Sequence, residues 1–535
     1  MATSLPPPAL TSVQIAQGLV HPGESWSSNT LTYSFPDQTS AWPGYASDEE
    51  PFVQYLPLSV AQAANFRLAI NAWDILIAPA FLETDDHSAT GVIRVAFSAY
   101  DKLGPDTETS AYAYRPPYTG NVAQPWEGDV WISASYKDLG FAPGSFSHET
   151  LLHEIGHALG LKHPFDDPLL PKVFDSVGFT LMSYTELRGI FQVRFEVEGP
   201  NLVASGTALA PSTPMVLDIA AIQSVYGADP TTALGPTTYA FNQDQGFIKT
   251  IYDAGGIDTI DLASFTRGSN VDLAPGAYSS IGYFSIADQI AVATSRHPAA
   301  ADWIREIFDD HGHDAYTWEH NLGIAFSTVI ENVIGGAGSD TITGNDVGNG
   351  LLGGAGDDFI RGLNGDDWMD AGAGVDDVNG NQGVDVVRGG DGADSVRGGQ
   401  GADTVYGDAG DDPHVNGNIG DDMVYGGSGN DTVFGGQGSD ALYGEEGNDW
   451  LSGDLGDDVL TGGGGADRFL FRPGAGMDWV TDFQSSTGDR IQLSPGVTYT
   501  LSEFQGQVIV DLGGGARIGL VAVPLSQLGD WLVVV

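Results

Sequence analysis

The sequence predicts a multidomain chain in which an α+β globular domain is followed by an all-β parallel β-roll. Two observations carry this prediction. Over residues 1–227, strand-like segments alternate with amphipathic helical segments, which is the pattern of an α+β domain. Between residues 335 and 467, aspartate instead returns at a period of nine residues within glycine-rich text. A fixed period of this kind is typical of a coiled repeat architecture.

The chain is strongly acidic, but its composition is that of a folded protein. It contains 71 aspartate and glutamate residues against 20 lysine and arginine residues, a formal net charge of −51. This charge excludes nucleic acid as a natural partner and argues against anionic membrane surfaces. A hydrophobic content of 41% argues against an acidic disordered tail. There is no cysteine for a disulfide framework, and no apolar run of about 18 residues predicts a membrane span.

The first domain, residues 1–227, should contain three recognisable strands and three helices. The strand-like segments are Thr30–Phe35, Gly91–Tyr100 and Gly128–Ala134. The expected helices run from Ser59 to Ile77, from near Ser147 to Gly160, and from Thr213 to Gly227. Serine or threonine at the start and glycine at the end are residues that cap helices, and Pro214 fits a first helical position.

Residues 228–334 read as a β-rich connecting region with an insertion at 297–321. Short strand-like runs with glycine turns, such as "TIYDAGGIDTIDL", support the β assignment. The insertion is charged and contains His297, His311, His313 and His320. We expect a solvated surface loop there, with a second metal site as the alternative. A further β region is expected over residues 468–535.

The repeats over 335–467 follow the pattern Gly-Gly-x-Gly-x-Asp-x-U-x, in which U is a large apolar residue. Asn349 replaces one aspartate, and the phase slips by one residue at Pro413. The glycines permit tight turns with positive φ, and the short strand that follows directs the U side chain inward. Two nonapeptides then make one coil of a parallel β-roll. A flexible glycine-rich linker, the alternative, does not explain the strict phase or the U position.

Stacked aspartates require a cation if this roll is to close. Carboxylates of like phase would lie about 4.8 Å apart and repel by about 3 kcal/mol at an effective dielectric near 20. One apolar side chain per repeat gains only about 1.5–3 kcal/mol on burial. Ca²⁺ takes about six to eight oxygen ligands from carboxylates and backbone carbonyls, and this nonapeptide is a known calcium-binding repeat. The predicted ligands of several structural calcium ions are Asp340, Asp358, Asp367, Asp376, Asp385, Asp394, Asp403, Asp412, Asp422, Asp431, Asp440, Asp449 and Asp458.

A metal-binding pattern of a different kind lies in "HEIGHALGLKH". His153 and His157 are one helical turn apart and face the same way, as two ligands of one metal must. Gly160 can end the helix in the left-handed conformation, so that His163 returns as a third ligand. Glu154 can then face water at the open position as general base. The extended motif is far more specific than two histidines on a helix, which are often satisfied core side chains.

Downstream of this motif, "LMSYTE" resembles the Met-turn of the metzincins. In that family the methionine, here Met182, lies beneath the zinc site. The segments "LTYSFP", "AYAY", "LDIAAIQSVYG" and "YDAGGIDTIDL", together with the repeats, are similar to one metzincin branch, the serralysin family of secreted zinc endopeptidases. The resemblance covers most of residues 30–535. It implies an α+β metzincin catalytic domain with one catalytic zinc on His153, His157 and His163. Glu154 then activates water, and Tyr184 stabilises the oxyanion; on its residue type alone, Tyr184 is equally a packing aromatic.

The resemblance also implies an extracellular monomer that cleaves proteins or peptides. The start of the sequence has no signal peptide of the Sec type, whereas Asp530 and the hydrophobic tail resemble a C-terminal signal for the type I secretion apparatus. Two features depart from the family pattern: little propeptide precedes "SVQIAQGL", and the segment between His163 and Met182 is short. Two alternatives stay open, a processing protease for one surface protein and a non-catalytic calcium-dependent adhesion protein. The intact motif residues argue against the second.

Overall fold

A computed structural model of the chain describes residues 10–46, 55–87, 91–98, 110–185, 187, 189–199, 201–524 and 531–534. Asp530, at the predicted secretion signal, lies outside the described residues. The chain forms two compact units. The N-terminal unit comprises Met1–Pro236, Asp244–Gly256 and Pro275–Val329, and the roll unit comprises Thr237–Gln243, Ile257–Ala274 and Ile330–Val535. The region over 228–334, expected as one connecting segment, is therefore divided between the two units.

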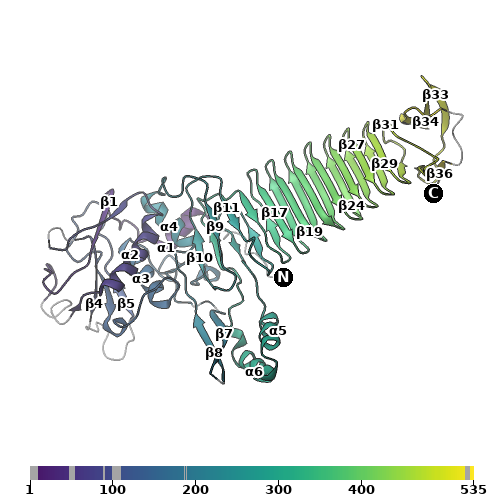
Figure 1. Ribbon diagram of the computed structural model, residues 1–535. Helices are drawn as coiled ribbons and strands as arrows, with labels where there is room; N and C mark the ends of the chain where they lie inside the picture. The colour runs from purple at the N-terminus through teal and green to yellow at the C-terminus, as the bar shows by residue number, and fades with distance from the viewer. Residues whose placement is uncertain are drawn as a thin grey trace. The chain divides into compact units, whose positions relative to one another are not determined.

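A six-stranded sheet forms one layer of the N-terminal unit (Figure 1). Its path is β3-β1-β4-β6-β5, and β2 pairs with β4. The pairs β2–β4 and β5–β6 are antiparallel, and the others are parallel. The strands are β1 (Thr30–Ser34), β2 (Tyr55–Leu56), β3 (Ala80–Glu83), β4 (Ile93–Ser98), β5 (Ala111–Ala113) and β6 (Val130–Ser133). The three predicted strands appear as β1, β4 and β6, and every side chain of β4 is buried.

Four helices pack with this sheet around one apolar core that includes Phe66, Trp73 and Ile222. They are α1 (Ser12–Leu19), α2 (Val60–Asp74), α3 (Phe146–Ala158) and α4 (Val216–Tyr226), with short 3-10 turns at η1 (Ala134–Tyr136) and η2 (Lys172–Phe174). The predicted cap Ser59 closes a capping box at the start of α2. The predicted start of α4 at Thr213 is wrong, because Met215 is its N-cap. The carboxylate of Asp218 reaches back to the Met215 N–H at 2.9 Å and so fixes the first turn there.

The insertion near 297–321 is helical, so the prediction of a solvated loop is wrong. Ile304 and Phe308, one helical turn apart, are buried in a small cluster with Ala293 and the partly buried Phe195. The elements around it are the hairpin β7 (Phe191–Glu198) and β8 (Asn201–Ala208), α5 (Ile286–Arg296), η3 (Pro298–Ala300), α6 (Ala301–His311) and η4 (Gly312–Asp314). A second sheet of this unit contains β10 (Lys249–Ile251), β13 (Tyr278–Ser279) and β14 (Leu322–Ile324). The side chains of His311 and His313 lie outside the described part of the chain, so a metal site there stays a prediction.

The roll unit is built from two long, mainly parallel sheets, which confirms the predicted β-roll. One sheet contains, in spatial order, β33 (Thr500–Phe504), β34 (Gln507–Gly513), β35 (Ala516–Leu520), β31 (Met477–Val480), β29 (Val459–Gly464), β27 (Ala441–Glu446), β25 (Met423–Ser428), β23 (Thr404–Ala409), β21 (Val386–Gly392), β19 (Trp368–Gly374), β17 (Gly350–Ala355), β15 (Asn332–Ile334), β11 (Thr259–Asp261) and β9 (Thr238–Ala240). The other contains β12 (Asn270–Asp272), β16 (Thr341–Thr343), β18 (Phe359–Asn364), β20 (Asp377–Gln382), β22 (Ser395–Gln400), β24 (His414–Ile419), β26 (Thr432–Gln437), β28 (Trp450–Leu455), β30 (Arg468–Phe471), β32 (Arg490–Leu493) and β36 (Leu532–Val534). The coils therefore begin before the first nonapeptide and continue beyond the last.

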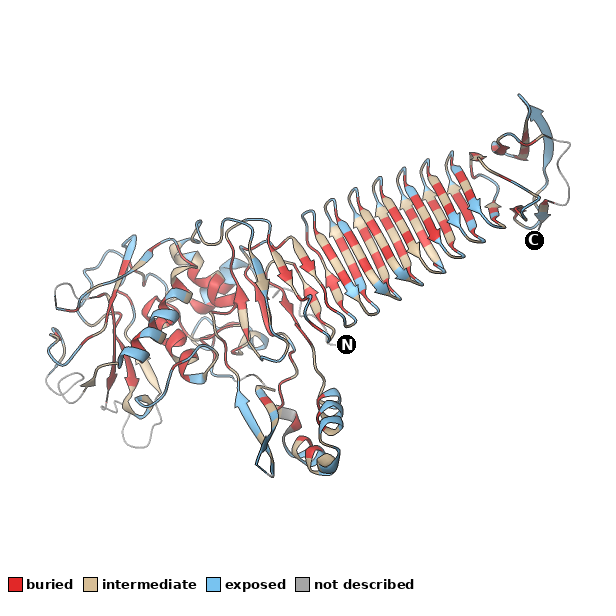
Figure 2. Ribbon diagram, viewed as in Figure 1, coloured by how far each residue is buried: buried red, intermediate tan, exposed pale blue. Residues whose placement is uncertain are grey.

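The interior of the roll is a file of single apolar side chains. Val378 pairs with Val396, and Val396 pairs with Val415; all three are fully buried. Figure 2 shows these buried positions as bands that alternate with more exposed positions along the strands. The extra residue at the phase slip is absorbed in the turn, where Pro413 is exposed and Val415 takes the interior position. The insertion therefore leaves the apolar file in register.

Candidate metal centres

Helix α3 carries His153 and His157 and ends where the motif predicts. The N–H of Gly160 donates to the His157 carbonyl, and the N–H of Leu161 donates to the Gly156 carbonyl, both at 2.9 Å. These two bonds are those of a Schellman C-cap. Gly160 has a φ of 104°, in the left-handed region that side chains strain to adopt. The chain turns back at this residue and so delivers a third histidine to the same place.

Nitrogen atoms of His153, His157 and His163 converge to within 4.8 Å of one another. Nδ1 of His153 lies 2.7 Å from the Leu181 carbonyl, and Nδ1 of His157 lies 2.9 Å from the Leu161 carbonyl. A carbonyl only accepts, so each Nδ1 carries the proton and donates it, which leaves the Nε2 lone pair for a metal ion. Burial lowers the pKa of His153 to about 4 and that of His157 well below its usual value. Three neutral imidazole nitrogens form a donor set that suits Zn²⁺.

Glu154 follows the first histidine and is also buried, with 6% of its surface exposed. Its Oε2 has no hydrogen-bond partner among the described residues, and burial raises the pKa of the carboxyl to about 8. A buried carboxyl oxygen without a partner is costly. A metal-bound water is a partner of the right kind, so this orphaned atom fits a metal held by the three histidines.

Tyr184 and Phe165 form the exposed side of the histidine cluster. The Tyr184 hydroxyl lies 2.7 Å from Nε2 of His163, and 65% of the tyrosine surface is exposed. The ring of Phe165 stacks on His163 with centroids 4.8 Å apart. On the other side of this histidine, Nδ1 lies 3.4 Å from the Asp166 carboxylate. Tyr184 therefore lies at the open face, within reach of a group bound next to His163.

Met182, the methionine of the predicted Met-turn, packs against the helix that carries His153 and His157. It is fully buried. Its Sδ is 2.9 Å from the position that a Cβ on Gly156 would occupy. Gly156 has no side chain, and this allows the methionine to approach the helix between the two histidines.

Asp218 is a supporting residue that sequence reasoning missed. Its carboxylate accepts from the Thr180 hydroxyl at 2.5 Å and from the Leu181 N–H at 2.7 Å. The carbonyl of the same Leu181 binds His153, so Asp218 holds the segment that orients one histidine. Burial raises the pKa of Asp218 to about 6. An acidic residue in the first turn of α4 was the available signal, but only the fold shows what it contacts.

The roll aspartates form a second candidate centre, along the axis of the coils. All thirteen predicted ligands are buried. From Asp358 onward, each Oδ1 in the ladder accepts an N–H from the residue one coil earlier, for example Asp376 N–H to Asp394 Oδ1 at 2.8 Å. The donor is an aspartate in every case except Asp367, whose Oδ1 accepts from Asn349. The predicted ligands whose Oδ2 has no hydrogen-bond partner among the residues that the structure describes are Asp358, Asp367, Asp376, Asp385, Asp394, Asp403, Asp412, Asp422, Asp431, Asp440, Asp449 and Asp458. Asp340 differs, because Ser269 and Gly336 N–H groups donate to its two oxygens.

Carboxylate and carbonyl oxygens converge beside the glycines of the turns. A Cβ placed on Gly389 would lie 2.7 Å from Asp394 Oδ2 and 2.7 Å from the Gly407 carbonyl oxygen. The same arrangement recurs at Gly444, with Asp449 Oδ2 and the Gly462 carbonyl oxygen both at 2.5 Å. Anionic and carbonyl oxygens around space that a side chain would fill are the ligand types of Ca²⁺. The unpartnered carboxylates therefore fit calcium along the ladder.

Comparisons with known proteins agree with the repeats and match the segment that follows the histidine cluster. The family described as RTX calcium-binding nonapeptide repeat matches residues 330–346, 351–378, 379–412, 414–442, 434–469 and 443–476. The family described as Peptidase M10 serralysin C terminal matches residues 216–317. Calcium binding by the repeats is therefore indicated by the family match as well as by the ladder.

Curated relatives are serralysins and related metalloproteases. Serralysin B of Dickeya chrysanthemi is 27% identical over 63% of this chain and 64% of its own length. Metalloprotease AprA of Pseudomonas entomophila is 29% identical over 64% of this chain and 65% of its own length. The chain thus matches less than two thirds of the length of each. Among solved structures, the AlgE6R3 subunit of the mannuronan C5-epimerase of Azotobacter vinelandii is 30% identical over 22% of this chain and 80% of its own, with a TM-score of 0.19.

These findings confirm the resemblance to the serralysin family that the motifs indicated. The longest described helix, α2, has 15 residues, and none of the described helices has the length and apolar content that a membrane crossing needs.

Proposed function

We propose that this protein is a secreted zinc endopeptidase of the serralysin type, with a metzincin catalytic domain and a roll that folds around calcium. One observation carries the proposal. Three imidazole nitrogens lie within 4.8 Å of one another, and a buried glutamate with an unpartnered oxygen lies beside them. The same constellation was predicted from the sequence motif, and the relatives are metalloproteases by name.

The residues of this site supply the steps of peptide hydrolysis. Zinc, when bound by His153, His157 and His163, supplies a Lewis acid that polarises a carbonyl and lowers the pKa of water. Glu154 accepts the proton of the attacking water and later delivers it to the leaving amine. Burial raises the pKa of Glu154 to about 8, close to the range in which a group can both take and return a proton. The exposed Tyr184 hydroxyl donates a hydrogen bond to the developing oxyanion.

The roll fits a protein that folds after export. Calcium-poor cytosol leaves the aspartate ladder without its ion, and calcium outside the cell completes it. We propose export by a type I secretion apparatus, in line with the secreted serralysins that the chain resembles. The exported protein then acts as a monomer and cleaves protein or peptide substrates outside the cell.

The proposal is tested with Glu154→Gln and His157→Ala in the full chain, assayed on casein, with zinc measured by elemental analysis. Glu154→Gln should keep its zinc and lose about 10²–10⁴-fold in turnover, because only the general base is removed. His157→Ala should lose zinc itself. Glu149→Gln, on the same helix outside the motif, is the matched control and should stay active. Full turnover in Glu154→Gln would overturn the assignment, and absence of wild-type hydrolysis in zinc and calcium would favour the non-catalytic adhesion protein.

A further inference from the structure

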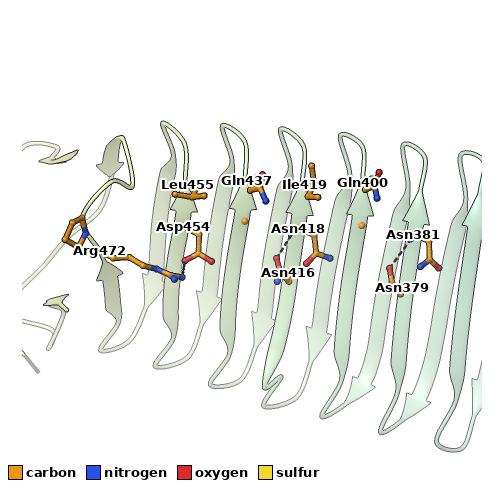
Figure 3. A pocket seen from close by; sticks show the side chains of 13 residues that line it. Asn379, Asn381, Gln400, Asn416, Asn418, Ile419, Gln437, Asp454, Leu455 and Arg472 are labelled. Carbon is orange, nitrogen blue, oxygen red and sulfur yellow. Dashed lines mark hydrogen bonds and ion pairs between the residues drawn. The ribbon is translucent and has the colours of Figure 1, made fainter. Parts of the chain in front are cut away.

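A groove of about 600 Å³ lies on the outer face of the 11-stranded sheet of the roll (Figure 3). It runs across neighbouring strands from β20 to β28 and reaches Arg472 and Pro473, just after β30. Its lining is mostly amide and small side chains: Asn379, Asn381, Gly399, Gln400, Asn416, Asn418, Ile419, Gly436, Gln437, Asp454, Leu455, Arg472 and Pro473. Neither the histidine cluster nor the aspartate ladder accounts for these amides.

The amides recur with the coils. The segment "NGNQG" at 379–383 returns as "NGNIG" at 416–420. In the strand between them, Gly399 pairs with Asn381 on one side and with Asn418 on the other. Asn381 and Asn418 are therefore two strands apart, about 10 Å at the usual strand spacing, with a recess at the glycine between them.

Asn381 and Asn418 are held in one unusual conformation. Their φ angles are 77° and 78°, in the left-handed region, and the equivalent positions in the strands β22 and β26 have Gly399 and Gly436. Each N–H donates to the Oδ1 of the asparagine two residues earlier, at 3.0 Å for Asn381 and 2.9 Å for Asn418. The Oδ1 of Asn381 is buried and has no hydrogen-bond partner within the described part of the chain. These bonds fix the side-chain amides of Asn379 and Asn416 before any ligand binds, and the matching turns place Asn381 and Asn418 at the same position in their coils.

The charge of the groove is balanced. Arg472 pairs with Asp454 at one end of it. Ile419 and Leu455 are 47% and 53% exposed and supply apolar surface next to the amides. Residues 331–470 contain 28 acidic residues and four arginines, so the surrounding roll repels polyanions. The strands that form the groove are hydrogen-bonded on both sides, so no free edge is available to a peptide that binds as an added strand.

We propose that this groove binds a neutral polysaccharide and so anchors the protein to a glycan surface, independently of the peptidase site. A sugar hydroxyl both donates and accepts hydrogen bonds, and an asparagine or glutamine amide does the same. The exposed Ile419 and Leu455 match the C–H faces of sugar rings. A periodic ladder of amides fits a polymer whose hydroxyl groups repeat along its length.

The test uses the full chain in saturating calcium, with cellohexaose, chitohexaose and maltohexaose titrated by calorimetry and polygalacturonate as the anionic comparison. We expect binding of at least one neutral hexaose, and at least tenfold weaker binding by the double variant Asn381→Gly and Asn418→Gly. Glycine already occurs at the equivalent positions Gly399 and Gly436 with positive φ, so this variant removes amides without straining the turns. Circular dichroism checks that both proteins have folded.

Glu445→Gly is the matched control, because Glu445 lies in the other sheet at the same turn position with a φ of 74°. It should bind the hexaoses as the wild type does. The proposal is overturned if the folded wild type binds none of the three, if the double variant binds as tightly as wild type, or if Glu445→Gly weakens binding equally. Binding of polygalacturonate alone would also overturn it, because the groove would then recognise an anionic polymer.

Discussion

The N-terminal unit and the roll unit bury apolar surface in different ways. In the N-terminal unit, large side chains such as Phe66 and Trp73 from α2 pack with residues from strands and helices distant in the sequence. In the roll, each strand contributes one interior side chain, such as Val396 or Val415, and its neighbours along the file come from the next coils. Since burial gains about 25 cal/mol per Å², a file of valines stabilises each coil far less than a cluster of aromatic rings stabilises a domain.

The two units also treat buried carboxylates differently. In the N-terminal unit, Asp86 pairs with Arg94 at 2.9 Å, and Asp218 accepts hydrogen bonds from Thr180 and Leu181. In the nonapeptide repeats, twelve buried aspartates have an Oδ2 with no hydrogen-bond partner among the described residues. Protein groups satisfy these two carboxylates of the first unit, whereas the unpartnered oxygens of the ladder fit a bound cation. The comparison predicts that the N-terminal unit folds without calcium, whereas the roll needs calcium to complete its core.

Calcium removal should break this comparison most strongly. In the full chain treated with a calcium chelator and resupplied with zinc, we expect the amides of the roll strands to lose hydrogen-exchange protection, because the ladder carboxylates then repel one another. The amides of α3 should stay protected, because their core needs no calcium. Peptide-resolved hydrogen exchange measures both units in one sample.

Magnesium is the control for this experiment, because it demands a small octahedral site and releases water reluctantly. It should restore little protection at concentrations where calcium restores all of it. Roll strands that stay protected in chelator, or that magnesium protects equally well, would contradict the calcium assignment. Loss of protection in α3 at the same calcium concentration would show that the two units do not fold independently.

Tyr184→Phe should affect only the chemistry of the N-terminal unit. The change removes one hydroxyl donor at the open face and keeps the ring that packs near His163. Loss of an oxyanion donor costs about 2.7–4 kcal/mol in turnover, so kcat should fall by about 10²–10³ with little change in KM. The calcium midpoint of the roll should not move. An unchanged kcat on a peptide substrate would leave Tyr184 as a packing aromatic.

The sequence predicted the features that depend on local residue patterns. The nine-residue period locates the interior valines and the buried aspartates, and the motif around Gly160 locates the end of α3. Sequence could not predict that residues 237–243 and 257–274 join the sheets of the roll, where Val271 pairs with Ile342. These early strands lack the nine-residue period, and their place in the roll depends on long-range pairing.

Contacts between distant segments were also beyond the sequence. Asp218 is acidic like many helix starts, but its role depends on the approach of Leu181, which lies 37 residues earlier. The helix at 301–311 looks charged and solvated in the sequence, yet Ile304 and Phe308 pack on the hairpin side chain Phe195. In each case the sequence does not show which two segments pack against each other. That pairing is determined by the folded core.

Asp218→Asn should weaken the N-terminal unit and its metal site together. The amide nitrogen cannot accept the N–H groups that the carboxylate accepts, so a buried donor loses its partner at a cost of about 1–3 kcal/mol. Because the Leu181 carbonyl orients His153, zinc affinity should fall as well. Asp86→Asn is the matched control, a buried carboxylate of the same unit paired with Arg94. Asp86→Asn should lower the melting temperature without changing zinc affinity. Equal zinc affinity in the two variants would show that Asp218 does not position His153.

The smallest expected effect is the pH dependence of the roll in chelator. Burial raises the pKa of Asp358 to about 8 and those of Asp403 and Asp440 to about 7, from an ordinary value of 3.8. The folded roll therefore holds these protons more tightly than the unfolded chain does. This contribution to stability is complete below the unfolded pKa and is lost as pH rises through the range of about 6–8.

Without calcium, the urea midpoint of the roll strands should thus be higher near pH 5 than near pH 8, measured by hydrogen exchange of the same peptides. At saturating calcium the midpoint should instead be lower near pH 5, because protons compete with the ion for the carboxylates. A calcium-free midpoint that rises between about pH 5 and about pH 8 would mean that the folded roll stabilises the charged carboxylates without calcium.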